Sequence, residues 1–132
     1  MQMQKRNFKP FEETRVKQIA FNIASGLKNL HDRRIFHRDI KPTNIFMKST
    51  EETAIPVIAD FGCSIRLKPG QMMDKLCGTI GYTAPEILLC QPYSFPSDIW
   101  SFGVLIYALC FGQLPFNELF VKLSRKNADD YR

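Results

Sequence analysis

Apolar residues recur every three or four positions between Glu12 and Arg33. They are Val16, Ile19, Ala20, Ile23, Leu27 and Leu30. Side chains at this spacing share one face of an α-helix. Pro10 lies just upstream, where a helix entry tolerates proline, and acidic Glu12 and Glu13 suit a first helical turn. The pattern therefore predicts a long amphipathic helix over residues 12–33.

Two short apolar runs follow this helix. Residues 45–47 (IFM) and 55–59 (IPVIA) are separated by the polar stretch 49–53 (STEET), which is typical of a turn, so the pair predicts a small β-hairpin. Residues 60–82 show neither a helical nor a strand period and are rich in glycine. A loop of this length inside a compact chain is usually functional or mobile.

The last third of the chain predicts two further helices. A short one covers Glu86–Cys90, directly after Pro85. A longer one has Ser97 as its N-cap and ends near Gly112, and because its apolar residues lie on all sides we expect it to be buried. The pattern thus predicts a mainly α chain of the α+β type, with a small hairpin, a long loop and a central buried helix.

Composition narrows the class of protein. The chain has 132 residues, of which 45% are hydrophobic and 23% charged, as in one ordinary globular domain. No apolar run reaches the roughly 18 residues of a membrane helix, and the N-terminus lacks the apolar core of a secretory signal. We therefore expect a cytoplasmic or nuclear location and no membrane association.

The net charge of +5 raises the question of an acidic partner or nucleic acid. The sequence has no nucleic-acid motif, and its aromatic residues are not interleaved with the basic ones as a stacking surface requires. We therefore expect a solvated basic surface and no nucleic-acid partner.

The 4 cysteines are scattered. They form no C-x-x-C pair and no zinc-site spacing. We expect reduced thiols, with a redox role for Cys63 or Cys77 as the alternative.

Polar residues suited to phosphate chemistry flank the predicted hairpin. Asp39, Lys41 and Asn44 precede its first strand, and Asp60 follows its second. Since the hairpin brings these two ends together, we expect Asn44 and Asp60 to lie close, and their amide and carboxylate oxygens suit Mg²⁺ with substrate phosphates. Asp39 would be free to orient a hydroxyl group and accept its proton, while Lys41 would neutralise a transferring phosphoryl group.

Four motifs in a fixed order extend this pattern. They are HRDIKPTN (37–44), ADFG (59–62), CGTIGYTAPE (77–86) and SDIWSFGV (97–104). The ordered set resembles the eukaryotic protein kinases, and Lys41 with Gly78-Thr79 resembles their serine/threonine branch. The resemblance implies that residues 1–132 are part of a kinase domain, namely its large C-terminal lobe with the activation loop. It also implies transfer of the ATP γ-phosphoryl group, with Mg²⁺, to serine or threonine hydroxyls of protein substrates.

The resemblance also assigns roles to single residues. Asp39 would be the catalytic base and Lys41 the lysine that faces the phosphate. Asn44 and Asp60 would be the Mg²⁺ ligands. Thr79 would contact both Asp39 and Lys41 and line the substrate-binding loop.

Further residues take supporting roles by the same resemblance. Phe46 would pack beneath the adenine ring of ATP. His37 and Phe61 would belong to a regulatory stack of side chains, with Gly62 completing the DFG turn. Asp98 would anchor this stack by bonding to the backbone of the catalytic loop.

Two departures from the family pattern lead to expectations of their own. Many kinases with an arginine before the base, here Arg38, neutralise it with a phosphate in the activation segment. Between Ser64 and Thr79 the chain has no Ser, Thr or Tyr, so we predict that Asp74 partly substitutes. Glu86 lacks the arginine that usually pairs with it, unless a residue of the tail substitutes, and a buried carboxylate without its partner costs roughly 3–5 kcal/mol.

The sequence contains no Gly-rich phosphate loop and no V-A-I-K lysine. In the family these lie upstream, so we expect Met1 to begin inside the large lobe and the chain to be truncated at both ends. Three interpretations stay open. The chain belongs to a kinase but is not competent alone; it is a non-catalytic lobe that binds a substrate or a regulatory protein; or it has no stable fold by itself.

Overall fold

The computed structural model describes residues 9–49, 51 and 53–116. Within them the helices are α1 (Glu13–Asp32), α2 (Pro85–Leu88) and α3 (Pro96–Phe111), with a 3-10 turn η1 (Pro42–Asn44), and the strands are β1 (Ile35–Phe36), β2 (Ile45–Met47), β3 (Pro56–Ile58) and β4 (Ile65–Arg66). The strands form two antiparallel pairs, β1–β4 and β2–β3. The prediction of a mainly helical chain with a small hairpin is confirmed. No helix in the described part is long and apolar enough to cross a membrane.

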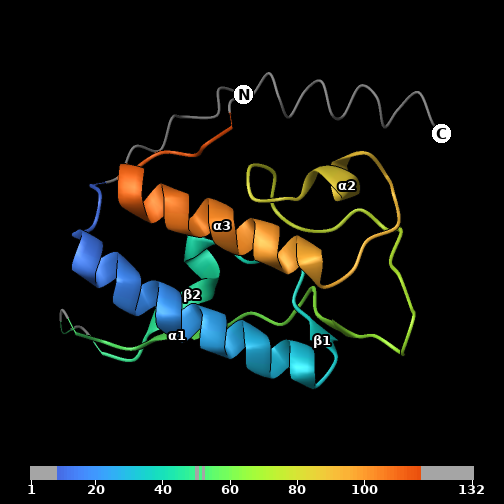
Figure 1. The fold of residues 1–132 in the computed structure, drawn as a ribbon, viewed down its shortest axis with the longest axis horizontal. Coiled ribbons are helices and arrows are strands. Elements are labelled where there is room, and N and C mark those ends of the chain that lie inside the picture. Colours follow the sequence, from blue (N-terminus) through green and yellow to red (C-terminus); the bar gives the residue numbers. More distant parts are fainter. Residues whose placement is uncertain (1–8, 50, 52, 117–132) are drawn as a thin grey trace.

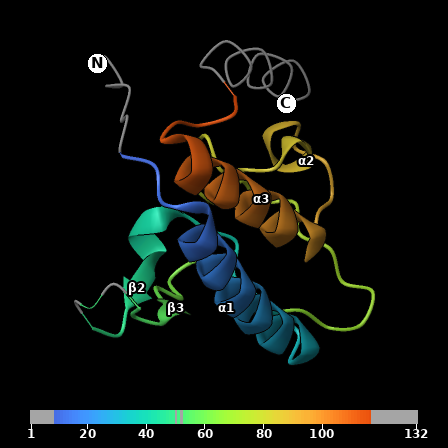
Figure 2. The same cartoon turned by 60° about the vertical axis from the view of Figure 1, so that its left-hand side comes forward.

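Helices α1 and α3 lie side by side and enclose the main core (Figures 1 and 2). This core consists of Val16, Ile19, Ile23, Leu27, Ile40, Leu105 and Leu109. The α1 members are the apolar stripe read from the sequence, and each fully buried aliphatic side chain contributes about 1.5–3 kcal/mol. Burial of one stripe therefore holds α1 against α3.

The hairpin β2–β3 packs on α1. Phe46 pairs with Val57 across the two strands. A Cβ atom added to Gly26 of α1 would lie 3.2 Å from Ile58 Cδ1. The absence of a side chain at Gly26 therefore lets the hairpin approach the helix closely.

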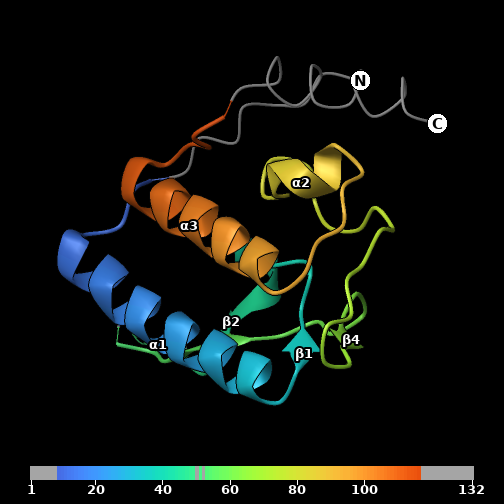
Figure 3. The ribbon, with the colours of Figure 1, turned by 45° about the vertical axis from the view of Figure 1, so that its right-hand side comes forward.

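The pair β1–β4 was not predicted. Each strand is 2 residues long, too short for an alternating pattern to be visible. It joins the chain just after α1 to the first part of the long loop (Figure 3). Beneath it lies a second core, formed by Phe36, Leu67, Ala84, Ile87 and Tyr93.

Two expectations about α3 are wrong. The helix begins at Pro96 rather than after a Ser97 cap, because proline suits the first helical position and the Ser97 hydroxyl is used elsewhere. The helix is also not buried on all sides: Ile99 and Phe111 are 52% and 60% exposed. The described residues cover only one face of α3. Its end at Gly112, in the left-handed conformation with φ 69°, is as predicted.

Candidate active site

A buried carboxylate on α3 organises the loop that follows β1. Asp98 is 1% exposed, and its Oδ2 and Oδ1 accept hydrogen bonds from the backbone N–H groups of His37 (3.0 Å) and Arg38 (2.8 Å). His31 Nε2 lies 2.8 Å from the same Oδ2. Arg38 has φ 69°, a conformation that costs a non-glycine residue about 1–2 kcal/mol. The bonds to Asp98 therefore hold a strained turn in place, and they are the bonds to the loop backbone that the resemblance implies for this aspartate.

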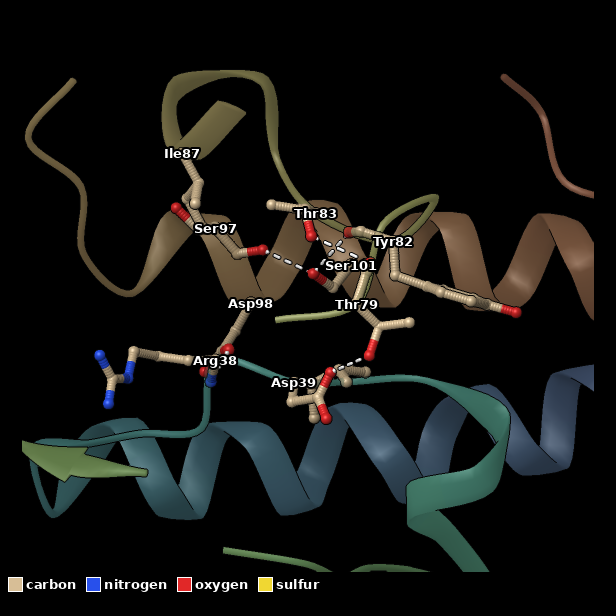
Figure 4. A pocket seen from close by; sticks show the side chains of 10 residues that line it. Arg38, Asp39, Thr79, Tyr82, Thr83, Ile87, Ser97, Asp98 and Ser101 are labelled. Atoms are coloured by element: carbon tan, nitrogen blue, oxygen red, sulfur yellow. Dashed lines mark hydrogen bonds between the residues drawn. The ribbon is translucent and has the colours of Figure 1, made fainter. Parts of the chain in front are cut away.

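The strained turn presents Asp39 to Thr79 (Figure 4) and also to Lys41. Thr79 Oγ1 donates to Asp39 Oδ1 over 2.6 Å, and Lys41 Nζ lies 2.8 Å from Asp39 Oδ2. Lys41 Nζ also donates to Thr79 Oγ1 over 2.7 Å. Asn44 Nδ2 donates to Asp39 Oδ2 over 3.0 Å and to the Asp39 carbonyl over 2.8 Å. The structure thus brings together four of the residues selected from the sequence.

These contacts determine the ionisation of Asp39. Partial burial raises the pKa of the Asp39 carboxyl group, but hydrogen bonds from Lys41, Thr79 and Asn44 and the charge of Lys41 together lower it further. The net result is a pKa below the ordinary value for aspartate. Asp39 is therefore an ionised hydrogen-bond acceptor at neutral pH.

The two ends of the hairpin meet beside this cluster. The backbone N–H of Ala59 donates to the Asn44 carbonyl over 2.9 Å. Asp60 is the residue after Ala59, so this hydrogen bond brings its backbone near Asn44. Asp60 has φ 58°, and its Oδ1 accepts a hydrogen bond from the Gly62 N–H over 3.1 Å. An amide and a carboxylate are a donor set that fits Mg²⁺ when phosphates and water complete its shell. No group of three or more His, Cys, Asp or Glu side chains that could hold a metal ion occurs among the described residues.

The remaining candidates lie around the same loop. The rings of His37 and Phe61 are in edge contact, with centroids 5.2 Å apart, and His37 Nε2 lies 3.1 Å from the Ala59 carbonyl oxygen. His37 is buried, whereas Phe61 is half exposed. Phe46, on β2, is 58% exposed and gives the hairpin an exposed apolar surface.

The predicted pairing of Asp74 with Arg38 is not made. The Arg38 side chain instead donates through Nε to the Cys63 carbonyl over 2.5 Å. Asp74 is exposed, and none of the ion pairs in the described part of the chain joins it to Arg38. The guanidinium group is turned toward the start of the long loop, which leaves Asp74 in solvent.

Glu86 is not left without a partner, contrary to the expectation. The Ser97 hydroxyl donates to Glu86 Oε1 over 2.6 Å, and the side chain is only half buried. A hydroxyl group from α3 therefore satisfies one oxygen of this carboxylate, which is only partly buried and so does not carry the full cost of a buried unpaired charge. The tail, residues 117–132, lies outside the described residues.

The redox alternative is disfavoured for Cys63. A hydrogen bond with Cys77, together with burial, raises the pKa of the Cys63 thiol to about 11. Since the thiolate is the reactive form, Cys63 is almost entirely protonated at neutral pH.

Two residues at the site were missed in the sequence analysis. His31, in the last turn of α1, contacts Asp98, and Tyr93 packs in the second core. His31 had a visible signal: it lies four residues after Leu27 and so continues the apolar stripe of α1, where a polar side chain needs a buried partner. Tyr93 lies in an irregular stretch without any periodic pattern.

Comparison with known proteins gives the family. A family model of the protein kinase domain matches residues 1–130. Similar proteins include serine/threonine-protein kinase ATG1b of Arabidopsis thaliana, 38% identical over 79% of this chain and 15% of that protein. Serine/threonine-protein kinase ATG1c of the same plant is 39% identical over 79% of this chain and 14% of its own length. Sperm motility kinase 2A of Mus musculus is 35% identical over 92% of this chain and 24% of that protein.

This chain therefore spans less than a quarter of the length of these relatives. The family match nevertheless covers nearly all of it and agrees with the motif resemblance. This chain belongs to the protein kinase domain family.

Proposed function

We propose that this chain is the large-lobe part of a serine/threonine protein kinase, with residues 60–86 as its activation segment. The reaction is transfer of the γ-phosphoryl group of ATP to serine or threonine hydroxyl groups of protein substrates. The observation that carries the proposal is the Asp39 carboxylate, held between Lys41 and Thr79 over 2.6–2.8 Å. The names of the similar plant proteins support the serine/threonine class.

Asp39 acts as the base in this proposal. Its low pKa keeps it ionised, so it accepts a hydrogen bond from the substrate hydroxyl and orients that oxygen toward the phosphoryl group. Lys41 faces the transferring group and offsets its negative charge. Thr79 holds the side chains of Asp39 and Lys41 in place and lines the substrate-binding loop.

The nucleotide is held by the hairpin end of the site. Asn44 and Asp60 would hold Mg²⁺, and the exposed Phe46 would pack beneath the adenine ring. Bound Mg²⁺–ATP would supply the phosphoryl group and part of the charge neutralisation. His37 and Phe61 support this end through their ring contact, with Gly62 closing the turn after Asp60.

Calorimetric titration of the chain with ATP, with and without Mg²⁺, tests the nucleotide site. We expect Mg²⁺-dependent binding that Asp60→Asn weakens at least tenfold, because a carboxylate ligand is lost. Asp74→Asn makes the same charge change at an exposed position and should leave binding unchanged. Binding that is equal in the two variants would contradict the assignment of Asp60.

Phosphoryl transfer is tested with labelled ATP and a serine- and threonine-rich protein substrate. In a protein that joins this chain to the Gly-rich loop and lysine that its sequence lacks, label should appear on the substrate and fall by about a hundredfold or more in Asp39→Asn, the scale of general-base catalysis. The chain alone, without these nucleotide-binding parts, should transfer no label. Equal labelling in both proteins would contradict the role of Asp39.

A second candidate function is that of a non-catalytic lobe that binds a regulatory protein. Exposed apolar side chains favour it: Phe46, Ile55 and Phe61 on and beside the hairpin are about half exposed. Apolar groups gathered on one surface are typical of a protein interface. A folded chain that binds no nucleotide would favour this candidate over the first.

A further inference from the structure

The central part of the long loop is attached to the rest of the molecule although it contains no residue that a kinase could phosphorylate. Between Ile65 and Gly78 the sequence has no serine, threonine or tyrosine. Asp74, the acidic alternative, is exposed and makes no ion pair with Arg38 in the described structure. Another group must therefore hold this part of the loop.

Tyr93 makes that connection from the segment between α2 and α3. Its backbone N–H donates to the Met73 carbonyl over 2.9 Å and its carbonyl accepts from the Met73 N–H over 2.8 Å, which forms an isolated antiparallel bridge. Its hydroxyl group donates to the Lys75 carbonyl. The loop is thus attached twice, once through backbone and once through the Tyr93 side chain.

The Tyr93 ring is itself firmly placed. It is 2% exposed and packs edge-on against Phe36 of β1, with ring centroids 5.8 Å apart. Burial raises the pKa of the phenol, although the neighbouring Arg38 guanidinium lowers it in part. The hydroxyl therefore stays protonated and can donate to Lys75 across the neutral pH range.

The attachment lies four residues before Thr79. After Lys75 the chain passes Gly78, where an added Cβ would come 2.8 Å from the Arg38 carbonyl oxygen, and reaches the Thr79 hydroxyl that bonds to Asp39. A loop fixed at Lys75 and pressed against Arg38 leaves Thr79 little freedom to move away from Asp39.

We propose that Tyr93 is a positioning residue: its hydroxyl group fixes the backbone at Lys75 and thereby keeps the Thr79 hydroxyl hydrogen-bonded to Asp39. This positioning needs no phosphorylation of residues 65–78. The contribution to phosphoryl transfer rests on the proposed function of Asp39. The attachment itself does not, and it can be measured without any enzyme activity.

Limited trypsin digestion tests the attachment directly, because trypsin cleaves after Lys75, the residue whose carbonyl Tyr93 holds. Tyr93→Phe keeps the ring and removes only the hydroxyl. We expect cleavage after Lys75 to become about three- to tenfold faster, the factor that one lost hydrogen bond gives to local opening. Cleavage after Lys48, in the hairpin connection, serves as the internal reference and should not change.

Tyr107→Phe is the matched control variant. Tyr107 packs against Phe111 on α3, with ring centroids 4.5 Å apart, and has no part in the loop attachment. It should leave both cleavage rates as in the unmodified chain. Equal acceleration at Lys48 and Lys75 in Tyr93→Phe, or none at either, would overturn the proposal.

The side-chain conformation of Thr79, followed by NMR through the three-bond couplings that report its χ1 angle, gives the second measurement. A hydroxyl group that donates to Asp39 and accepts from Lys41 holds one rotamer in the unmodified chain, and we expect averaging between rotamers in Tyr93→Phe. A role of Tyr93 confined to the loop itself would leave a single rotamer, and that result would also overturn the proposal. Failure to bind ATP would bear on the proposed function alone, since neither measurement involves nucleotide.

Discussion

Two stretches of chain meet at Asp39 and are held in different ways. The turn 37–44 is anchored from several sides by the buried Asp98, by Thr79 and by its own Asn44. The segment 60–78 is largely exposed and is attached at separate points: β4, the Cys63 carbonyl and the bridge between Met73 and Tyr93.

The difference has an energetic meaning. A change in the turn should destabilise the whole fold, because its contacts reach the core helix α3. A change in the segment should open it locally, because each attachment serves only its neighbours. The attachment of the segment 60–78 can therefore change while the turn 37–44 stays folded.

The substitution Asp98→Ala should have the largest effect of those that test the difference between the two stretches. It leaves the backbone N–H groups of His37 and Arg38 without acceptors and removes the side chain that holds the strained turn. We therefore expect a loss of about 3–4 kcal/mol in the free energy of unfolding. Urea denaturation measures it. Asp74→Ala, in the exposed segment, should change this free energy by less than about 0.5 kcal/mol. Similar values for the two variants would contradict the difference between the stretches.

Two glycines of the segment 60–78 show where this segment presses on the turn 37–44 and where it does not. Gly70 has φ 74° with nothing within 4 Å of an added Cβ, whereas Gly78 has φ 106° and an added Cβ would lie 2.8 Å from the Arg38 carbonyl oxygen. Gly70→Ala should cost about 1 kcal/mol, from backbone strain alone. Gly78→Ala should cost about 2–3 kcal/mol, since strain and overlap with the turn add.

Thermal or urea unfolding of both alanine variants compares them directly. Equal losses would mean that the segment does not press on the turn at Gly78.

The smallest effect expected is a pH dependence from Asp39. Because the folded state lowers its pKa, Asp39 stabilises the fold above the ordinary pKa of a carboxyl group, and this contribution is lost as the pH falls through the folded-state value. Urea unfolding from pH 7 down to pH 2 should therefore show a larger loss in the unmodified chain than in Asp39→Asn. Parallel curves for the two proteins would contradict this origin of the low pKa.

The sequence predicts those parts of the fold whose cause is local. The stripe of α1 and the two runs of the hairpin repeat at the spacing of their own secondary structure, and both elements are present as predicted. The contact of Thr79 with Asp39 and Lys41 was expected only from the resemblance, because nothing local joins residues 39 and 79.

The parts that were missed depend on partners distant in sequence. β1 and β4 are short strands paired across about thirty residues. Tyr93 contacts the loop through backbone hydrogen bonds, which any residue type can make and which the sequence therefore does not indicate. Ser97 has a typical cap side chain, but Pro96 begins the helix and Glu86 takes the hydroxyl. In each case tertiary contact decided between options that were locally equivalent.

The hydrogen bonds at Thr79 can run in one direction only. A lysine ammonium group has donors and no acceptor, and an ionised carboxylate has acceptors and no donor. The Thr79 hydroxyl must therefore receive from Lys41 and give its single proton to Asp39. Serine at this position would preserve that order of protons, whereas valine, similar in shape, would abolish it. The carboxylate of Asp39 accepts hydrogen bonds from all of these neighbours. A further hydroxyl group that approaches Asp39 can therefore bond to it only as a donor.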